Sequence, residues 1–142
     1  MNLRHIFFAF VLVLVGSSLN AQSTYYHNQL DGPALETGMA RLQDSGELVT
    51  GRVVTKYDSG QLRLEGFYVA GKKEGAFRWW YASGQLGSEE NYLNDLKHGV
   101  CRQWHANGQL KQEAQYQNGK QKGRTKYWDK NGSKRKIKRA NR

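Results

Sequence analysis

The strongest constraint on the fold of this chain is a block of residues that recurs every 24 positions. Each block begins with a glycine, and these are Gly51, Gly75, Gly99 and Gly123. A second glycine, a leucine, a glutamate and a tyrosine follow at fixed distances, as in Gly84, Leu86, Glu89 and Tyr92. Self-similarity at a fixed period is typical of solenoids and other tandem arrays. A spacing kept across so many residue types therefore predicts a row of equivalent structural units.

Each unit holds two short segments rich in aromatic residues, and glycine-containing turns such as Ser83-Gly84 separate them. This pattern is typical of β-hairpins, because glycine tolerates the positive φ that a tight turn needs. Helix is disfavoured, since each glycine inside a helix costs about 1 kcal/mol. A single hairpin is not stable in water, so neighbouring units must stack. The sequence predicts an all-β fold of 24-residue hairpins stacked into an elongated, twisted, single-layer antiparallel ribbon.

A four-residue turn suggests a register for the second hairpin. On one side of the ribbon, the expected pairs are Tyr81 with Leu86, Trp79 with Ser88, and Phe77 with Glu90. On the other side, Arg78 faces Glu89 and, one unit later, Arg102 faces Glu113. Opposite charges across two strands stabilise a sheet by about 0.2 to 1 kcal/mol per pair. The glutamate column is therefore predicted to be structural rather than catalytic.

Two columns are expected to form the continuous seam between units, and they are Tyr57/Tyr81/His105 and Leu62/Leu86/Leu110. Three tryptophans, Trp80, Trp104 and Trp128, fall on the other parity. They either cover a second surface of the ribbon or form a face for a ligand. Together with Arg78 and Arg102, these tryptophans are the candidate partner-binding residues.

The N-terminus has the three-part layout of a secretory signal peptide. Arg4 precedes an apolar run over residues 6–15, and small or polar residues follow up to Ala21. The apolar run is too short for a permanent membrane anchor, although an uncleaved signal anchor is the alternative. We expect residues 1–21 to be removed, which leaves an exported protein that is periplasmic, on the outer surface or secreted.

The rest of the chain divides into three parts. Residues 22–45 carry little pattern, although Tyr25 and Tyr26 are able to begin an edge strand and Ala34 to Leu42 to form a short helix. The repeat domain is predicted over residues 46–132, with units 51–74, 75–98 and 99–122 and a partial unit 123–132. The fourth unit then fails, because Lys134 replaces the expected leucine and Ile137 the expected glutamate. The tail, 133–142, is predicted to be disordered.

The net charge of +10 arises largely in this tail, whose basic residues are Lys134, Arg135, Lys136, Lys138, Arg139 and Arg142. Nucleic-acid binding is not expected, because it requires basic charge along a folded face and the repeat body is only mildly basic. The tail is either a solvated terminus without function or an arm that contacts an anionic surface. Anionic lipids, cell-wall polymers and an acidic toxin surface are the candidates for such a surface.

The chain has a single cysteine, Cys101, so no intramolecular disulfide is possible. It lies between His98 and His105, which raises the possibility of a Cys/His nucleophile or a metal site. The repeat places Cys101 in the column of Val53 and Phe77, where a packing residue is expected, and metal-ligand spacings such as Cys-x-x-Cys are missing. The sequence thus predicts no catalytic, metal or cofactor-binding residue, and the protein is not expected to be an enzyme.

Three runs carry a family resemblance, and they are YDSGQLRLEGFYVAGKKEG, YASGQLGSEENYLNDLKHG and HANGQLKQEAQYQNGKQKG. They resemble the variant MORN repeat, whose bacterial members include the YwqK-type antitoxins. Asp95 departs from the pattern where Gly71 and Gly119 stand, and His105 departs where tyrosine is expected. The resemblance implies stacked hairpins, no cofactor, and a binding or scaffolding role.

These observations favour a non-enzymatic, protein-binding module of the cell envelope, acting as a toxin-neutralising antitoxin or immunity protein. A membrane- or phospholipid-associated scaffold is the alternative. A purely structural envelope protein is another, since the edge strands of a ribbon are able to pair with further copies.

Overall fold

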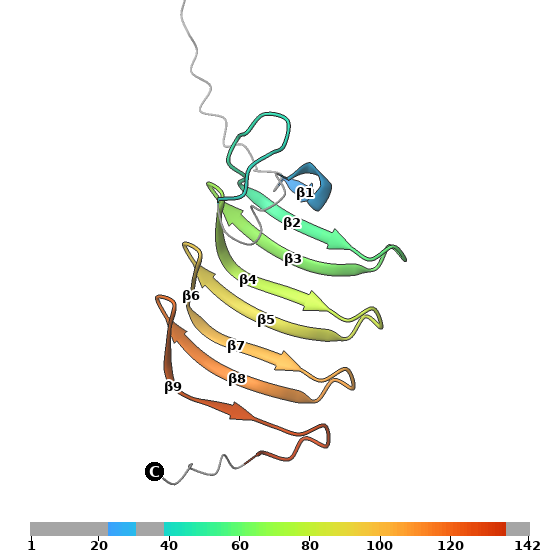
Figure 1. Ribbon diagram of the computed structural model, residues 1–142, viewed down its shortest axis with the longest axis vertical. Helices are drawn as coiled ribbons and strands as arrows, with labels where there is room; N and C mark the ends of the chain where they lie inside the picture. The colour runs from blue at the N-terminus through green and yellow to red at the C-terminus, as the bar shows by residue number, and fades with distance from the viewer. Residues whose placement is uncertain (1–22, 31–38, 136–142) are drawn as a thin grey trace, which may run out of the picture.

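A computed structural model describes residues 23–30 and 39–135, which form one open β-sheet of nine strands (Figure 1). The strands are β1 (Thr24–Tyr26), β2 (Gly51–Lys56), β3 (Leu62–Val69), β4 (Lys72–Trp80), β5 (Leu86–Leu93), β6 (Leu96–Lys97), β7 (Gly99–Trp104), β8 (Leu110–Gln117) and β9 (Lys120–Tyr127). Their order in the sheet is β1-β2-β3-β4-β5-β7-β8-β9, and β6 also pairs with β5. Chain order is thus sheet order, as the predicted ribbon of stacked hairpins requires.

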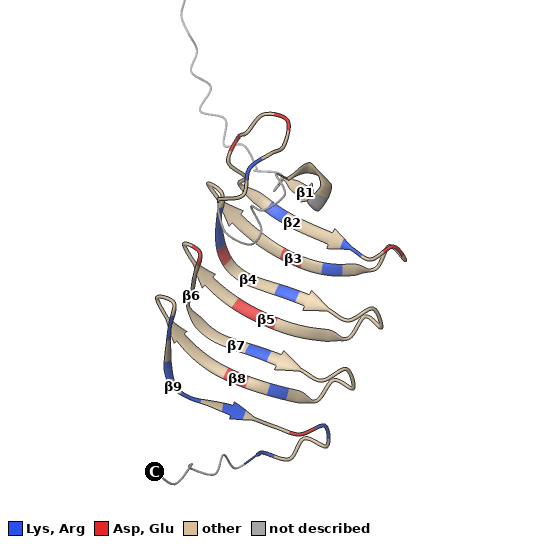
Figure 2. Cartoon of the chain, viewed as in Figure 1, with Lys and Arg blue, Asp and Glu red and all other residues tan. Residues whose placement is uncertain are grey.

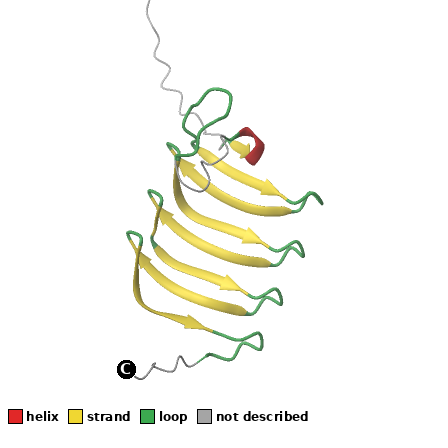
Figure 3. Ribbon diagram, in the orientation of Figure 1, coloured by secondary structure: helices red, strands yellow, loops and turns green. Residues whose placement is uncertain are grey.

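Strands and short turns make up almost all of the described chain (Figure 3). A single turn of 3-10 helix, η1 (His27–Gln29), follows β1. All strand pairs are antiparallel except β1 with β2, which is parallel. In the described ranges, no helix has the length and apolar character to cross a membrane. The predicted all-β, single-layer architecture is confirmed.

The turns between the two strands of a unit share one pattern of hydrogen bonds. In the second unit, the N–H of Tyr81 donates to the carbonyl of Gln85 at 2.9 Å, and the N–H of Gly84 donates to the carbonyl of Tyr81 at 2.9 Å. Gly84 has a φ of 84°, a left-handed conformation that disfavours residues with a Cβ. This requirement explains why glycine recurs at this position in every unit.

The register of the hairpins is partly as predicted. Arg78 faces Glu89, and Trp79 faces Ser88. The expected pair of Tyr81 with Leu86 is wrong, because a bulge shifts the register after Trp79 and brings Trp80 opposite Leu86. Directly opposed residues in an antiparallel pair share a face, so the leucine column lies with the tryptophans. The predicted seam of tyrosines with leucines is therefore also wrong.

The sheet thus has two distinct faces, named here by their characteristic columns. The Trp face carries Trp80, Trp104 and Trp128, the leucines Leu62, Leu86 and Leu110, and the arginine and glutamate columns. The Tyr face carries Tyr57, Tyr81 and His105, together with Phe77, Trp79, Cys101 and Tyr92. Each face therefore has its own chemistry along the whole array.

Large and small side chains alternate on the Tyr face. A Cβ on Gly66 would lie 2.2 Å from the Phe77 ring, and a Cβ on Gly87 would lie 2.2 Å from the Trp79 ring. Trp79 in turn meets Tyr81 edge to face, with ring centroids 4.6 Å apart. The two glycines, one from each of the first two units, thus provide the space in which two large rings of the second unit pack.

The main apolar cluster lies at the N-terminal end of the ribbon. It consists of Leu30, Ala40, Val49, Val53, Tyr68 and Phe77, with Tyr25, Leu42 and Tyr92 packed against it. Several of these residues belong to the lead-in that carries little sequence pattern. The lead-in covers part of the Tyr face of the first two units and gives this thin sheet a core.

The described lead-in is extended in β1 and over residues 39–42, and it also contains η1 and a turn over residues 43–45. Tyr25 and Tyr26 lie in β1, as predicted for an edge strand. A helix over Ala34 to Leu42 is wrong for the described residues 39–42, and its remaining part lies outside the described residues. There the N–H of Ala40 donates to the carbonyl of Gly71 at 2.7 Å, a contact to the β3–β4 turn that an extended strand provides.

The C-terminal end of the described chain begins a fourth hairpin without completing a second strand. After β9, Asp129 and Ser133 close a turn of the same kind, and Trp128 forms an isolated bridge with Lys134. The predicted signal peptide, residues 1–21, and the tail beyond Arg135 lie outside the described residues.

Candidate functional site

Three tryptophans form a row along the turn end of the Trp face. Trp80 and Trp104 end β4 and β7, and Trp128 directly follows β9. All three side chains are half-buried. Leu86 lies opposite Trp80 and Leu110 opposite Trp104, so aromatic and aliphatic side chains alternate along the ribbon. The tryptophans lie on the face opposite to the tyrosine column, as predicted, but they share their face with the leucine column, which was predicted on the other side. Their role in binding stays a prediction.

A ladder of alternating charge crosses the Trp face beside this row (Figure 2). From β3 to β9 its members are, in register, Glu65, Arg78, Glu89, Arg102, Glu113 and Lys126. Within hairpins, the nitrogen-to-oxygen distances are 2.7 Å for Arg78–Glu89 and 3.0 Å for Arg102–Glu113. These are the two cross-strand pairs predicted from the sequence, and both are confirmed.

The ladder lowers the pKa of one of its carboxylates and leaves the arginines accessible. The hydrogen bonds from Lys126 and Arg102 hold the pKa of Glu113 below its ordinary value. The side chains of Arg78 and Arg102 retain 42% and 39% of their exposure. Because the two arginines lie two residues before Trp80 and Trp104, each unit presents one guanidinium and one indole on the same face.

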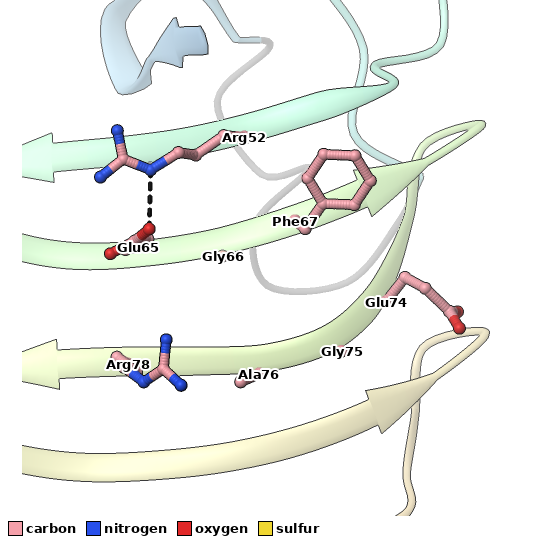
Figure 4. Close-up of a pocket in the computed structure, with 8 residues that line it drawn as sticks. All are labelled: Arg52, Glu65, Gly66, Phe67, Glu74, Gly75, Ala76 and Arg78. Carbon is pink, nitrogen blue, oxygen red and sulfur yellow. Dashed lines mark hydrogen bonds and ion pairs between the residues drawn. The ribbon is translucent and has the colours of Figure 1, made fainter. Parts of the chain in front are cut away.

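An open hollow of about 400 Å³ lies where β4 bends away from β3 (Figure 4). It is lined by Arg52, Glu65, Gly66, Phe67, Glu74, Gly75, Ala76 and Arg78. Gly75 has a φ of 72°, which produces the bend. The hollow is lined by one aromatic ring, that of Phe67, and by two members of the charge ladder, Glu65 and Arg78.

The Tyr face is used for contacts between units. The hydroxyl of Tyr57 donates to the carbonyl of Trp80 at 2.7 Å, and that of Tyr81 donates to the carbonyl of Trp104 at 3.0 Å. In the third unit, Nε2 of His105 lies 3.1 Å from the carbonyl of Trp128. A histidine tautomer with its proton on Nε2 makes the same bond as a tyrosine hydroxyl, which explains how His105 replaces tyrosine.

A polar cluster on the Tyr face was missed by the sequence analysis. Glu90 accepts hydrogen bonds from Lys97 Nζ at 2.7 Å and from the Tyr92 hydroxyl at 2.6 Å. Burial raises the pKa of Glu90, but these two hydrogen bonds and the charges of Lys97 and Lys73 together outweigh burial, so the pKa is lowered overall. The equivalent positions in the neighbouring units are the small residues Gly66 and Ala114. A charged Glu90 between them in this column was the sequence signal that could have revealed the cluster. With its partners satisfied, Glu90 has the surroundings of a structural group.

Cys101 is buried on the Tyr face, in the packing position that the repeat predicts. Burial raises the pKa of its thiol, which keeps the sulfur protonated and unreactive. The ring of His98 bonds the side chain of Asn118 at 3.2 Å, while His105 bonds a backbone carbonyl. Over residues 23–30 and 39–135, no three His, Cys, Asp or Glu side chains gather as a metal site would require.

The described part of the basic tail lies next to β9. Lys134 and Arg135 are exposed, and the N–H of Arg135 donates to the carbonyl of Tyr127 at 2.8 Å. The other predicted contacts to an anionic surface, Lys136, Lys138, Arg139 and Arg142, lie outside the described residues. Their role stays a prediction.

Comparison with known families supports the central hairpins directly. Two adjacent segments, residues 73–94 and 97–118, match the MORN repeat variant. Each MORN match covers most of one structural unit. It begins just after one turn that joins two units and ends in the next turn of that kind. MORN repeats are generally non-catalytic modules for binding. A search of curated proteins and a search of solved structures each find no match.

Proposed function

We propose that this protein is a non-enzymatic binding module of the cell envelope that holds a protein partner on its Trp face. The observation that carries the proposal is the row of half-buried tryptophans beside accessible arginines, Trp80 with Arg78 and Trp104 with Arg102. Tryptophan and arginine are enriched among the residues that dominate binding energy at protein interfaces. An open ribbon also presents a long surface to an extended partner.

The Tyr face is the poorer candidate for the same role. Its Tyr57, Tyr81 and His105 side chains already bond carbonyls of the next unit. The lead-in also packs against this face in the first two units. A partner on the Tyr face would have to displace these contacts, whereas the Trp face is open.

The cellular role follows from the sequence of the N-terminus. A signal peptide over residues 1–21 supports export, and exported binding modules with YwqK-like repeats are suited to immunity against a toxin that acts outside the cytoplasm. In this role the protein neutralises the toxin by covering it. A phospholipid-associated scaffold is the second candidate, because Lys134 and Arg135 are exposed beside a strand rich in lysine.

Two adjacent residues of β8 make it possible to test which face of the sheet contacts the partner. Gln115 lies on the Trp face, and Tyr116 lies on the Tyr face, since they pair with Val100 and Gly99 respectively. A photo-crosslinking phenylalanine analogue is placed at one position or the other, and the protein is irradiated in its own cells. We expect one recurrent protein to be crosslinked from Gln115 and not from Tyr116.

The tryptophans provide the second arm of this test. The pair of changes Trp80→Ala and Trp104→Ala is expected to abolish the crosslink from Gln115 while circular dichroism still reports a folded sheet. Crosslinking from Tyr116 alone, or capture of lipids without any recurrent protein, would show that the proposal is wrong.

A further inference from the structure

The C-terminal edge of the described sheet is β9, whose second side is paired only in part among the described residues. β9 pairs with β8, and among the described residues its other side has only the bridge between Trp128 and Lys134 and the bond from Arg135 to Tyr127. The carbonyl of Tyr127 thus points away from β8. Because backbone directions alternate along a strand, Thr125 also directs its N–H and carbonyl outward. Such an edge is a template for one more strand.

The charge of this edge differs from that of the rest of the sheet. Four basic residues of β9 are exposed, and they are Lys120, Lys122, Arg124 and Lys126. Lys122 pairs with Gln115 and Lys126 with Glu113, which places both on the Trp face. Arg124 lies between them with the same parity as Lys126. β9 therefore presents basic side chains at alternate positions on one face.

The charge ladder ends one carboxylate short at β9. Arg102 has Glu89 on one side and Glu113 on the other in the register. Among residues 23–30 and 39–135, Lys126 has only Glu113 as a carboxylate partner, with an ion pair of 2.9 Å. In the sequence, the position one period after Glu113 is Ile137, so the chain does not provide the missing acid there.

We propose that the β9 edge binds an extended acidic segment of a partner protein, which adds to the sheet as a further antiparallel strand. Acidic residues at alternate positions of that segment face Lys126, Arg124 and Lys122 and extend the ladder. The intervening residues hydrogen-bond the outward backbone groups of Thr125 and, by displacing the N–H of Arg135, the carbonyl of Tyr127. This surface adjoins the tryptophan row at Trp128, but the inference rests on the edge and the charge of β9 and not on the proposed function.

Two other occupants have the wrong charge. A second copy of this chain would bring its own β9, whose charged residues are all basic, against the same basic edge. The chain's own C-terminus from Ser133 to Arg142 contains basic residues and no Asp or Glu. Its described part contacts β9 only through the Trp128–Lys134 bridge and the bond from Arg135 to Tyr127. Like charges directly opposite one another destabilise a pair of strands.

The probe for this proposal is a fluorescein-labelled, acetylated peptide of four Glu-Thr repeats, whose binding to the full chain is measured by fluorescence anisotropy. We expect saturable binding that weakens at high salt, and no binding of the matching Lys-Thr peptide. The double change Lys122→Glu with Arg124→Glu is expected to weaken binding at least tenfold. Lys111→Glu, a charge reversal on β8, is the matched control and is expected to leave binding unchanged.

Backbone methylation separates strand addition from simple charge attraction. Residues opposite Thr125 and Tyr127 must donate their N–H groups to the edge, whereas residues opposite Lys126 point theirs away. N-methylation at the Thr positions of the peptide is therefore expected to weaken binding at least tenfold, and N-methylation at the Glu positions to have little effect. Equal binding by both methylated peptides would overturn the proposal.

The other occupants appear as distinct outcomes. Removal of residues 136–142 is expected to change peptide affinity less than threefold. A tenfold gain in affinity would identify the chain's own C-terminus as the occupant and overturn the proposal. Sedimentation that reveals a dimer dissociated by the peptide would also overturn it, in favour of a second copy. Each of these results leaves the crosslinking test of the Trp face unaffected.

Discussion

Hydrogen bonds from the Tyr/His column are expected to contribute measurably to the coupling between units. Tyr81→Phe removes the hydroxyl that donates to the carbonyl of Trp104 at 3.0 Å and keeps the ring that packs 4.6 Å from Trp79. The net value of such a bond is about 0.5 to 1.5 kcal/mol. With a urea m-value of about 2 kcal/mol per molar, a loss of 1 kcal/mol lowers the unfolding midpoint by about 0.5 M.

The column also provides the controls for urea unfolding followed by circular dichroism. Tyr57→Phe removes the equivalent 2.7 Å bond and is expected to have an effect of similar size. Tyr116→Phe removes a hydroxyl that makes no hydrogen bond within the described residues, and we expect it to shift the free energy of unfolding by less than about 0.5 kcal/mol. His105→Tyr should preserve the midpoint, whereas His105→Phe should lower it. Equal effects of Tyr81→Phe and Tyr116→Phe would refute the assignment of this column to inter-unit coupling.

Three further predictions concern other parts of the array. Tyr68→Phe is expected to preserve or raise the urea midpoint, because the Tyr68 hydroxyl is buried without a partner in the described part of the chain; a fall of more than about 1 kcal/mol would contradict this. Gly66→Ala should destabilise the fold by about 1 to 3 kcal/mol, since its Cβ would meet the Phe77 ring at 2.2 Å, and the companion change Phe77→Leu should recover part of the loss. The lowered pKa of Glu113 means that its ion pairs stabilise the fold above the ordinary carboxyl pKa, about 4.3, and that this contribution is lost as the pH falls through the lower folded value. Unfolding midpoints measured from pH 7 to pH 3 should therefore fall less steeply for Glu113→Gln than for the unchanged chain, and parallel curves would contradict the prediction.

The candidate site was only partly accessible from the sequence. The period placed Arg78 opposite Glu89 and separated the tryptophans from the tyrosines, because both relations depend on parity within a regular strand. The sequence analysis placed the leucine column on the wrong face of the sheet, because the pairing of Trp80 with Leu86 depends on a bulge. Gly87 was the relevant signal, because glycine inside a strand often marks such an irregularity.

The sequence by itself determined the hairpin unit, its turns and the charge ladder. These features depend on contacts within one unit or between adjacent units, and the same contacts recur with every period, so the pattern repeats visibly along the chain. Glycine at the turn and glutamate opposite arginine are local requirements that any unit must meet.

Only the tertiary structure decided how the array ends. Leu30, Ala40 and Val49 cover the Tyr face of the first units through contacts that occur once, so no period reveals them. Hydroxyl bonds such as that of Tyr81 join residues 23 positions apart, and their existence depends on how adjacent hairpins are spaced. The partly unpaired edge at β9 is also a tertiary feature. A strand becomes an edge when no neighbouring strand pairs along its second side, and the residues of the strand itself do not specify this.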